Sequence, residues 1–253
     1  MKTYLLGFSI VIFCFSCATK KQINYLQDID TNQNTTIHNT AISIQPKDIL
    51  KITVTTLIPE AAIPYNNISF GNTVNQNLEV MKLDGYVVSE LGSINFPVLG
   101  AIAVTGKTTA QLETALKETL VTGGHLKNPT VSVRLLNAKF TILGEVNNPG
   151  TFGFTEERLS VFQALGLAGD LTITGEREDV LLIREHDGKR LVSHIDLTRS
   201  DWFETDLYHI KPNDVLVVNP NSKKVKSAGL IGDTSAILGI ASLVISITIL
   251  ITR

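Results

Sequence analysis

One seven-residue pattern occurs twice in this chain and constrains its fold more than any other feature. Residues 44–50 read IQPKDIL, and residues 210–216 read IKPNDVL. In each copy Pro and Asp supply turn chemistry, and the apolar residues that follow are typical of a buried strand. The repeat therefore predicts two structural units, each with a proline turn that leads into a strand. A chance match between two common turns is the alternative explanation.

The first unit is expected over residues 42–137. Apolar and polar residues alternate over 50–54, which is typical of a half-buried strand, and 131–135 repeats this pattern. Thr108 and Gln111 have the spacing of a capping box, in which each side chain bonds the backbone N–H of the other residue at the start of a helix. We therefore expect a helix packed on a small sheet.

The second unit is expected over residues 138–220. Ser160 and Gln163 have the spacing of another capping box, so a short helix is expected to begin there. Pro149 and Gly150 suit the two central positions of a type II turn, the second of which needs a positive φ. A short helix on a small mixed sheet is a β-grasp arrangement. The predicted fold class is therefore α+β, with two small mixed α/β modules.

The N-terminus has the pattern of a bacterial lipoprotein signal. Residues 1–16 combine a lysine with an apolar stretch that is too short to span a bilayer. Ser16 precedes Cys17, and a small residue before a cysteine is what the lipoprotein peptidase requires, so Cys17 is the predicted lipidation site. A plain secretory signal with a chance cysteine is the alternative. Residues 17–41 are rich in Asn, Gln and Thr and are expected to form the lipidated N-terminus and a tether.

The C-terminus predicts a single transmembrane helix over residues 234–252, after a linker at 221–233. The stretch holds no charged residue, and as a helix it would extend about 28 Å, close to the hydrocarbon thickness of about 30 Å. A lone tail anchor is one interpretation. Small residues at heptad spacing favour instead helix packing or the wall of a lumen. These residues are Gly232, Ser235, Gly239, Ser242 and Ser246.

Composition argues against several other classes of protein. The formal net charge is −2 and the basic residues are scattered, so no nucleic-acid partner is expected. None of the five histidines has metal-ligand spacing to a cysteine or to another histidine, and no phosphate-binding loop or nucleophile elbow occurs. We therefore expect no enzyme, with no catalytic residue, metal or cofactor, although two carboxylates that cleave glycosides need not be close in sequence.

The order of the motifs resembles the polysaccharide biosynthesis/export family. The first unit is similar to the family's export domain at residues 44–50, 83–85, 96–100, 104–108 and 128–131. The second is similar to its soluble-ligand-binding β-grasp (SLBB) domain at residues 144–146, 148–150, 165–169 and 210–216. The residues that match the family's turns are Pro46, Asp48, Asp84, Gly85, Pro149, Gly150, Pro212 and Asp214. The family's Pro-Gly-Asp turn lacks its central Gly in both copies, which have Lys47 and Asn213 instead.

This resemblance implies a subunit of an outer-membrane channel that exports capsular or extracellular polysaccharide. The implied location is the bacterial outer membrane, with a lipid anchor and with the soluble domains in the periplasm. The implied partners are the polysaccharide cargo, outer-membrane lipid, an inner-membrane polysaccharide co-polymerase, and further copies of the chain in a ring homo-oligomer, which is an octamer in the resembled channel. The alternative is a lipid-anchored periplasmic module that binds glycan or protein and forms no pore.

Overall fold

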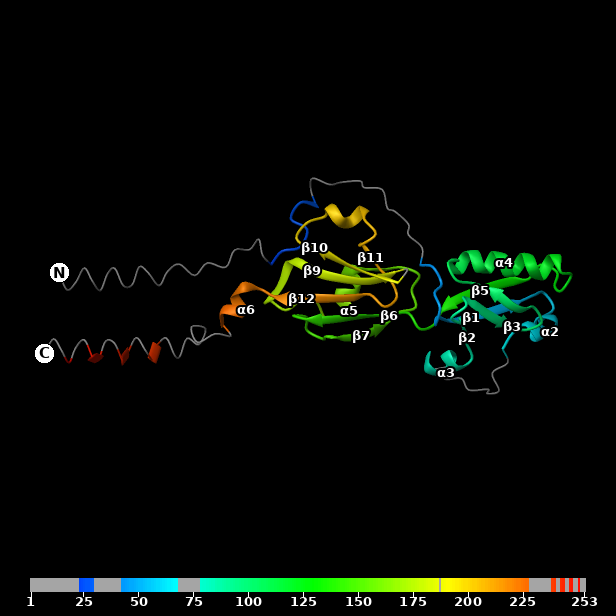
Figure 1. Ribbon diagram of the computed structural model, residues 1–253, viewed down its shortest axis with the longest axis horizontal. Coiled ribbons are helices and arrows are strands. Elements are labelled where there is room, and N and C mark those ends of the chain that lie inside the picture. Colours follow the sequence, from blue (N-terminus) through cyan, green and yellow to red (C-terminus); the bar gives the residue numbers. More distant parts are fainter. Residues whose placement is uncertain are drawn as a thin grey trace.

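The structure is a computed structural model that describes residues 23–29, 42–67, 78–186 and 188–227, together with 238–239, 242–243, 246–247 and 250. The described part is mixed α/β with few helices, and its buried apolar side chains form two separate clusters. Figure 1 shows the corresponding regions end to end along the long axis of the molecule. We call residues 42–135 the first module, residues 139–220 the second module, and residues 136–138 between them the joint.

The first module is built on a three-stranded antiparallel sheet with the order β2-β1-β5. Its strands are β1 (Ile49–Thr55), β2 (Tyr86–Val87) and β5 (Thr130–Leu135). The helix α4 (Thr109–Thr122) lies along β5 (Figure 1). The smaller elements are α2 (Pro59–Ala62), η3 (Ile63–Tyr65), α3 (Leu78–Leu83) and a hairpin of β3 (Ser93–Phe96) and β4 (Gly100–Ala103).

Apolar side chains of the helix α4 and of the strand β1 pack together in the core of the first module. Leu112, Leu116 and Leu120 lie on one side of α4 and are each at most 1% exposed. They share a cluster with the inward side chains of β1, which alternate along the strand as the sequence predicts. The capping box at Thr108 and Gln111 is confirmed, since each side chain bonds the backbone N–H of the other residue. A local signal therefore fixes where α4 begins.

The second module contains a five-stranded mixed sheet with the order β10-β9-β12-β6-β7. β12 is parallel to β6, and the other neighbouring strands are antiparallel. The sheet strands are β6 (Lys139–Gly144), β7 (Gly150–Gly153), β9 (Gly175–His186), β10 (Lys189–Ile195) and β12 (Val215–Pro220). The remaining elements are β8 (Leu159–Ser160), α5 (Val161–Leu167), η4 (Asp201–Glu204), β11 (His209–Ile210) and α6 (Ser222–Ser227).

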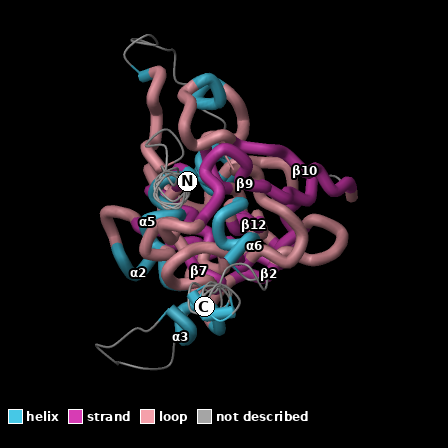
Figure 2. Tube along the Cα trace, turned by 90° about the vertical axis from the view of Figure 1, so that its left-hand side faces the viewer, coloured by secondary structure: helices cyan, strands magenta, loops and turns pink. Residues whose placement is uncertain are grey.

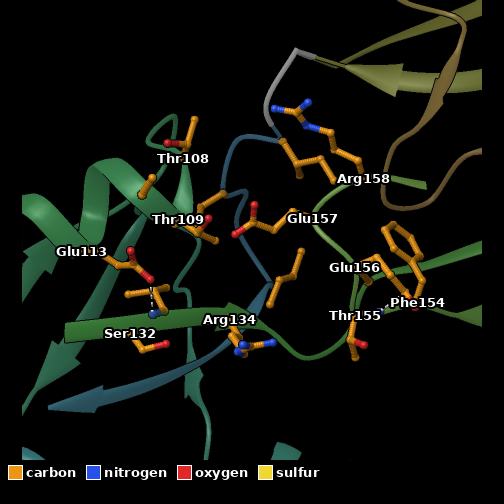
Figure 3. Close-up of a pocket in the computed structure, with 16 residues that line it drawn as sticks. Thr108, Thr109, Glu113, Ser132, Arg134, Phe154, Thr155, Glu156, Glu157 and Arg158 are labelled. Carbon is orange, nitrogen blue, oxygen red and sulfur yellow. Dashed lines mark hydrogen bonds between the residues drawn. The ribbon is translucent and has the colours of Figure 1, made fainter. Parts of the chain in front are cut away.

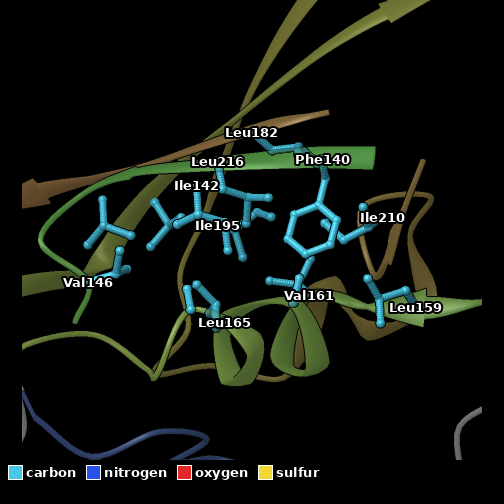
Figure 4. Packing of buried hydrophobic residues seen from close by; sticks show 14 of the residues in the cluster. Phe140, Ile142, Val146, Leu159, Val161, Leu165, Leu182, Ile195, Ile210 and Leu216 are labelled. Carbon is cyan, nitrogen blue, oxygen red and sulfur yellow. The ribbon is translucent and has the colours of Figure 1, made fainter. Parts of the chain in front are cut away.

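Apolar side chains fill the space between α5 and this sheet. Figure 4 shows Val161 and Leu165 of α5 directed toward Phe140, Ile142 and Leu216 of the sheet, and all five are at most 2% exposed. The capping box at Ser160 and Gln163 is confirmed and fixes the start of α5. The second module therefore has its own core, centred on one short helix.

The joint is held by hydrogen bonds from both modules. The side chain of Asn137 bridges two backbone groups of the first module: its Oδ1 accepts from Ile49 N at 2.9 Å, and its Nδ2 donates to Lys47 O at 3.0 Å. In the second module, Phe154 N donates to Ala138 O at 3.0 Å. The joint is therefore held by hydrogen bonds to both modules.

Residues 23–29, which belong to the expected tether, pack on the second module. The hydroxyl of Tyr25 donates to Asp170 Oδ1 at 2.5 Å, and its ring lies edge-on to Phe162. The guanidinium of Arg177 lies 5.3 Å from the centre of the Tyr25 ring. Burial, followed by the hydrogen bond to Asp170, raises the pKa of Tyr25. This part of the N-terminal segment is therefore docked.

The structure corrects the predicted C-terminal element. Among the residues that the structure describes, no helix is long and apolar enough to cross a membrane. The longest described helix, α4, has 14 residues, whereas a spanning helix needs about 20. The expectation of a fold that ends in a single transmembrane helix over 234–252 is therefore wrong.

The predicted type II turn at Pro149 and Gly150 is also wrong. Gly150 opens β7 and pairs with Ile142 of β6, and it does not have the positive φ that the turn requires. The positive φ in this region belongs to Gly144, at +91°. A Cβ atom at Gly144 would lie 2.0 Å from the carbonyl oxygen of Val218, so close backbone packing requires glycine there.

Candidate functional site

The two copies of the repeated pattern form the same turn in the two modules. In the first, Asp48 N donates to Gln45 O at 3.2 Å, and in the second, Asp214 N donates to Lys211 O at 3.1 Å. Proline occupies the second position of each turn, and the third residue has a positive φ, which defines a type II turn. We call these the first turn, residues 45–48, and the second turn, residues 211–214.

In each turn the aspartate side chain adds a second hydrogen bond that closes the turn. Asp48 Oδ2 accepts from the backbone N of Gln45 at 2.8 Å, and Asp214 Oδ2 accepts from the backbone N of Lys211 at 2.7 Å. Both carboxylates are buried, at 6% and 1% exposure. The two aspartates that the sequence singled out therefore have the same local role, which is to hold the first residue of the turn.

The positions of the missing glycines have the backbone geometry that glycine favours. Lys47 has a φ of +74° and Asn213 a φ of +68°. This left-handed conformation costs an ordinary L-residue about 1–2 kcal/mol, whereas Asn adopts it more readily because its short polar side chain bonds locally. The chain therefore keeps the geometry of the turn without its usual residue, and the first turn is the more strained of the two.

A buried arginine supports the second turn. Arg184 in β9 donates from Nε to Asp214 Oδ1 at 2.9 Å and from Nη2 to Asp214 Oδ2 at 2.7 Å, which is a bidentate pair. Its remaining donors reach the carbonyl of His209 and both the carbonyl and the carboxylate of Asp206. Lys211 Nζ also contacts the Asp206 carboxylate, at 2.6 Å. The second turn is therefore anchored by a network of buried and half-buried charges.

The first turn is supported by an uncharged side chain instead of an arginine. Asn137 holds the carbonyl of Lys47 and the amide of Ile49 on either side of Asp48. The side chain of Lys47 is exposed and pairs with Glu90 at 3.2 Å. Burial raises the pKa of Asp48, and the hydrogen bond from Gln45 N offsets part of that effect.

Two cavities lie beside the joint. One, of about 440 Å³, is bordered by the start of α4 and by β5 on one side and by residues 154–158 on the other. Figure 3 shows Thr109, Glu113 and Glu157 around it. Glu113 Oε1 accepts from the backbone N of Val133 at 2.8 Å, so this carboxylate is held by the edge strand β5. We call this space the smaller cavity.

The other cavity, of about 820 Å³, is lined by both proline turns and by the tip of the β9–β10 hairpin. We call it the larger cavity. Its lining holds five basic and three acidic residues, and four of the basic ones form ion pairs. Arg190 pairs with Glu185 and Lys47 with Glu90 within the wall, and Arg184 and Lys211 pair with Asp214 and Asp206. The wall is therefore polar and nearly balanced in charge. Such a wall can form hydrogen bonds with a hydrated ligand.

The structure brings together some of the predicted site residues and separates others. Pro46, Asp48 and Pro212 line the larger cavity, and Asp214 lies directly behind its wall in the pair with Arg184. Asp84 lies elsewhere in the first module, where its carbonyl accepts from the side chain of Asn67. The other predicted turn residues that do not line this cavity are Gly85, Pro149 and Gly150. At Gly85 a Cβ atom would lie 2.3 Å from a side-chain carbon of Ile49, so packing explains this glycine.

The remaining predicted residues belong to the two ends of the chain. Cys17, Gly232 and Ser235 lie outside the described residues. Gly239, Ser242 and Ser246 are described as exposed helical residues, and each serine hydroxyl donates to a carbonyl three or four residues earlier, at 2.8 Å. Their role in helix packing stays a prediction. In the part of the chain that the structure describes, no cluster of His, Cys, Asp and Glu is arranged to hold a metal ion.

Sequence reasoning missed Arg184 and Asn137. Arg184 had a signal, because Val180, Leu182 and Arg184 alternate along β9 and all three are buried. A period-two pattern therefore places an arginine on the core face, where it needs a carboxylate partner. Asn137 had no comparable signal, since its two partners, Ile49 and Lys47, are 88 and 90 residues away.

Comparison with known proteins identifies the family. Residues 37–136 match the family model described as polysaccharide biosynthesis/export protein, and residues 139–192 match the model of the SLBB domain. The two matches fall on the first and second modules, in the order that the resemblance implies, and together they cover more than half of the chain. The chain belongs to the polysaccharide biosynthesis/export family. The resemblance inferred from the motifs is thereby confirmed.

Two relatives within this export family carry the name EPS I polysaccharide export outer membrane protein EpsA. The one from Ralstonia nicotianae is 32% identical over 143 residues, which are 54% of this chain and 37% of the relative. The one from Ralstonia solanacearum is 27% identical over 198 residues, which are 76% of this chain and 51% of the relative. The chain therefore spans about half or less of the length of these relatives. The first turn lies inside the export match, and the second turn lies beyond the SLBB match.

Proposed function

We propose that this chain is an outer-membrane component of a machine that exports bacterial capsular or extracellular polysaccharide. The observation that carries the proposal is that an export module is followed by an SLBB module in one chain. The joint between them is held by the hydrogen bonds of Asn137. The names of both Ralstonia relatives support the outer-membrane location and the polysaccharide cargo.

The proposal extends to a passive role as one subunit of an oligomeric channel. A polymer in transit needs a polar path that binds it weakly, because tight sites would arrest it. The charge-balanced wall of the larger cavity has this character. Passage without chemistry also fits the family, whose name describes export. The driving force then comes from an inner-membrane polysaccharide co-polymerase, and Cys17 carries the lipid anchor.

A genetic experiment tests the export role. Surface polysaccharide is measured in cells that lack the gene, in cells complemented with the wild-type chain, and in cells complemented with Cys17→Ser. We expect the surface polymer to be lost without the chain and restored by the wild type, and Cys17→Ser to move the protein out of the outer-membrane fraction. Normal surface polymer in the deletion strain would overturn the proposal.

The native mass of the full chain in mild detergent separates the channel from its alternative. A complex of many copies supports the channel subunit. A monomer that still restores surface polymer points instead to a lipid-anchored module that binds glycan or protein without forming a pore. The same preparation, probed for a co-purifying inner-membrane protein, tests the proposed partner.

A further inference from the structure

The five-stranded sheet of the second module has two edge strands, and among the described residues no further strand pairs with either of them. β10 is the last strand on one side and β7 the last strand on the other. Among the described residues, no backbone hydrogen bond from either strand leads beyond the sheet. Unpaired edges are templates for another chain, and proteins usually protect them with covering elements, prolines or inward charges. Neither strand contains proline.

The β10 edge is also apolar at its centre. Leu191 is 52% exposed and Val192 is 54% exposed, one on each face of the sheet. Figure 2, which views the molecule along its long axis, shows β10 at the outer limit of one side and β7 on the opposite part of the module. Two copies placed side by side, with parallel long axes, would therefore bring β10 of one copy toward β7 of the next.

The strand directions suit such a contact. From β10 to β7 the sheet has three antiparallel steps and one parallel step, so β10 and β7 run in opposite directions. If the next copy has the same orientation, its β10 lies antiparallel to β7. Antiparallel pairing places the hydrogen-bonding groups of the two strands directly opposite each other. A contact between two different edges is heterologous and repeats from copy to copy, which is the contact that a ring requires.

The pairing within one copy fixes the register. Val192 pairs with Ile183, which pairs with Val215, which pairs with Thr141, which pairs with Thr151. These five residues lie on one line across the sheet. With no shift between copies, Val192 therefore faces Thr151 of the next copy, on the outer face of the sheet. This register sets residues 190–193 against residues 150–153.

Side chains and charges agree with the same register. Leu191 faces Phe152 of the next copy on the core side of the sheet, where both are incompletely covered within one copy. The basic residues Lys189 and Arg190 begin β10, and the exposed acidic residues Glu156 and Glu157 follow the end of β7. Antiparallel pairing brings these opposite charges to the same end of the contact. Within one copy Arg190 pairs with Glu185, but both side chains are largely exposed and can exchange partners.

We propose that β10 of one copy pairs with β7 of the next, residues 190–193 antiparallel to residues 150–153, and so joins the SLBB modules into one continuous sheet. This inference rests on the proposed oligomeric channel and specifies the surface through which its subunits meet. The occupant of the β10 edge is a second copy of this chain.

Cysteine cross-linking of the full chain in mild detergent tests the register. Val192→Cys and Thr151→Cys are combined in one chain, because both side chains are on the outer face and Val192 is largely exposed. We expect oxidation to link the double variant into ladders of covalent multimers, since facing residues have Cβ atoms about 4.5–5.5 Å apart. Each single variant and the wild type, whose cysteines are Cys14 and Cys17, are oxidised in parallel and should form no ladder. His194→Cys with Thr151→Cys, displaced by two residues, should link less.

Each outcome decides a different question. Dimers from Val192→Cys alone would show that β10 pairs with itself, and that result overturns the head-to-tail contact. A complex of high mass in which the double variant forms no ladder also overturns the edge pairing, but it leaves the proposed channel intact. A monomer in all variants, together with the absence of links, contradicts both. Surface polysaccharide in the same strains reports on export independently of the cross-link.

Reversing the charges at the two strands gives a second test of the contact. Lys189→Glu with Arg190→Glu should weaken association about tenfold, as expected for the loss of two rim charge pairs. Adding Glu156→Lys and Glu157→Lys in the same chain should restore it, because the pairs are rebuilt with reversed sign. A fourfold variant that associates no better than the double variant would contradict the charge pairing.

Discussion

The two proline turns have the same backbone and different support. Both are type II turns closed by a buried aspartate, and both place a residue other than glycine at a positive φ. The second turn is anchored by the buried guanidinium of Arg184, whereas the first is held by the neutral amide of Asn137. The comparison teaches that Pro and Asp set the shape of the turn, while distant residues decide how firmly it is held.

The sharpest test of this difference removes the charge partner of the second turn. Arg184→Met should lower the free energy of unfolding of the second module by about 3–5 kcal/mol, because Asp214 is left buried without a counter-charge. Trp202, the one tryptophan of the chain, is buried in the core of the second module, so its fluorescence during urea unfolding measures this module selectively.

Arg190→Met is the matched control for that experiment. Arg190 is in the neighbouring strand and forms an ion pair with Glu185, but both side chains are more than 60% exposed. Such a pair contributes about 0–1 kcal/mol. Equal shifts of the urea midpoint in the two variants would show that the Arg184 pair is no more important than a surface pair.

The neutral support of the first turn should be weaker. Asn137→Ala removes two hydrogen bonds and leaves the amide of Ile49 without its acceptor, which is expected to cost about 2 kcal/mol. Because Asn137 also forms the joint, the distance between spin labels on the two modules should become more broadly distributed. Hydrogen exchange at Ile49 should become faster.

The chain offers a close control for Asn137. Asn66 makes a similar bridge near the other end of β1, where its side chain bonds both N and O of Val54. Asn66→Ala should destabilise the first module by a comparable amount and leave the distance distribution between modules unchanged. If both variants broaden that distribution alike, Asn137 has no specific role in the joint.

These cases also separate what the sequence could predict from what it could not. Both capping boxes were predicted correctly because their two members are three residues apart and act on each other's backbone. The type II turn was assigned to Pro149 and Gly150 because Pro-Gly is its usual signature, yet the actual turns use Lys47 and Asn213. In these turns the closing aspartate and the packing around it outweigh the preference for glycine.

The features that the sequence did not predict correctly are mainly those that depend on tertiary contacts. The larger cavity exists because the tip of the β9–β10 hairpin comes near two turns that are distant in sequence, and no local pattern predicts that meeting. The docking of Tyr25 depends on Asp170 and Arg177, about 150 residues further along the chain. The membrane helix was predicted from charge and length alone, and no described helix is long and apolar enough to cross a membrane.

The strain in the first turn predicts a smaller, stabilising effect. Lys47→Gly should raise the free energy of unfolding of the first module by about 0.5–1 kcal/mol, because glycine removes the left-handed penalty but has more freedom in the unfolded chain. Asn213→Gly should change the second module by less, since Asn tolerates this conformation. Lys47→Ala is the control, because it loses the ion pair with Glu90 but keeps a Cβ atom. A stabilisation by alanine as large as that by glycine would contradict the argument from strain.

The smallest expected effect is a pH dependence that comes from the carboxylate of Asp48. Burial raises the pKa of Asp48 in the folded protein, so the folded state favours the protonated form. The resulting stability is present below the unfolded pKa, about 3.9, and is lost as the pH rises through the folded value. Asp48→Asn removes this dependence while its amide oxygen still accepts from Gln45. Relative to the wild type, its first module should therefore gain stability, measured by hydrogen exchange in β1, as the pH rises above the unfolded value of about 3.9.

The same substitution in the second turn should act in the opposite direction at neutral pH. Asp214→Asn takes the counter-charge away from the buried guanidinium of Arg184, so the urea midpoint of the Trp202 signal should fall. If both asparagine variants lower stability at pH 7 by similar amounts, then the two carboxylates are equivalent. The contrast between a charged and a neutral support would then have no energetic basis. Opposite signs would show that one turn geometry has been stabilised in two physically different ways within one chain.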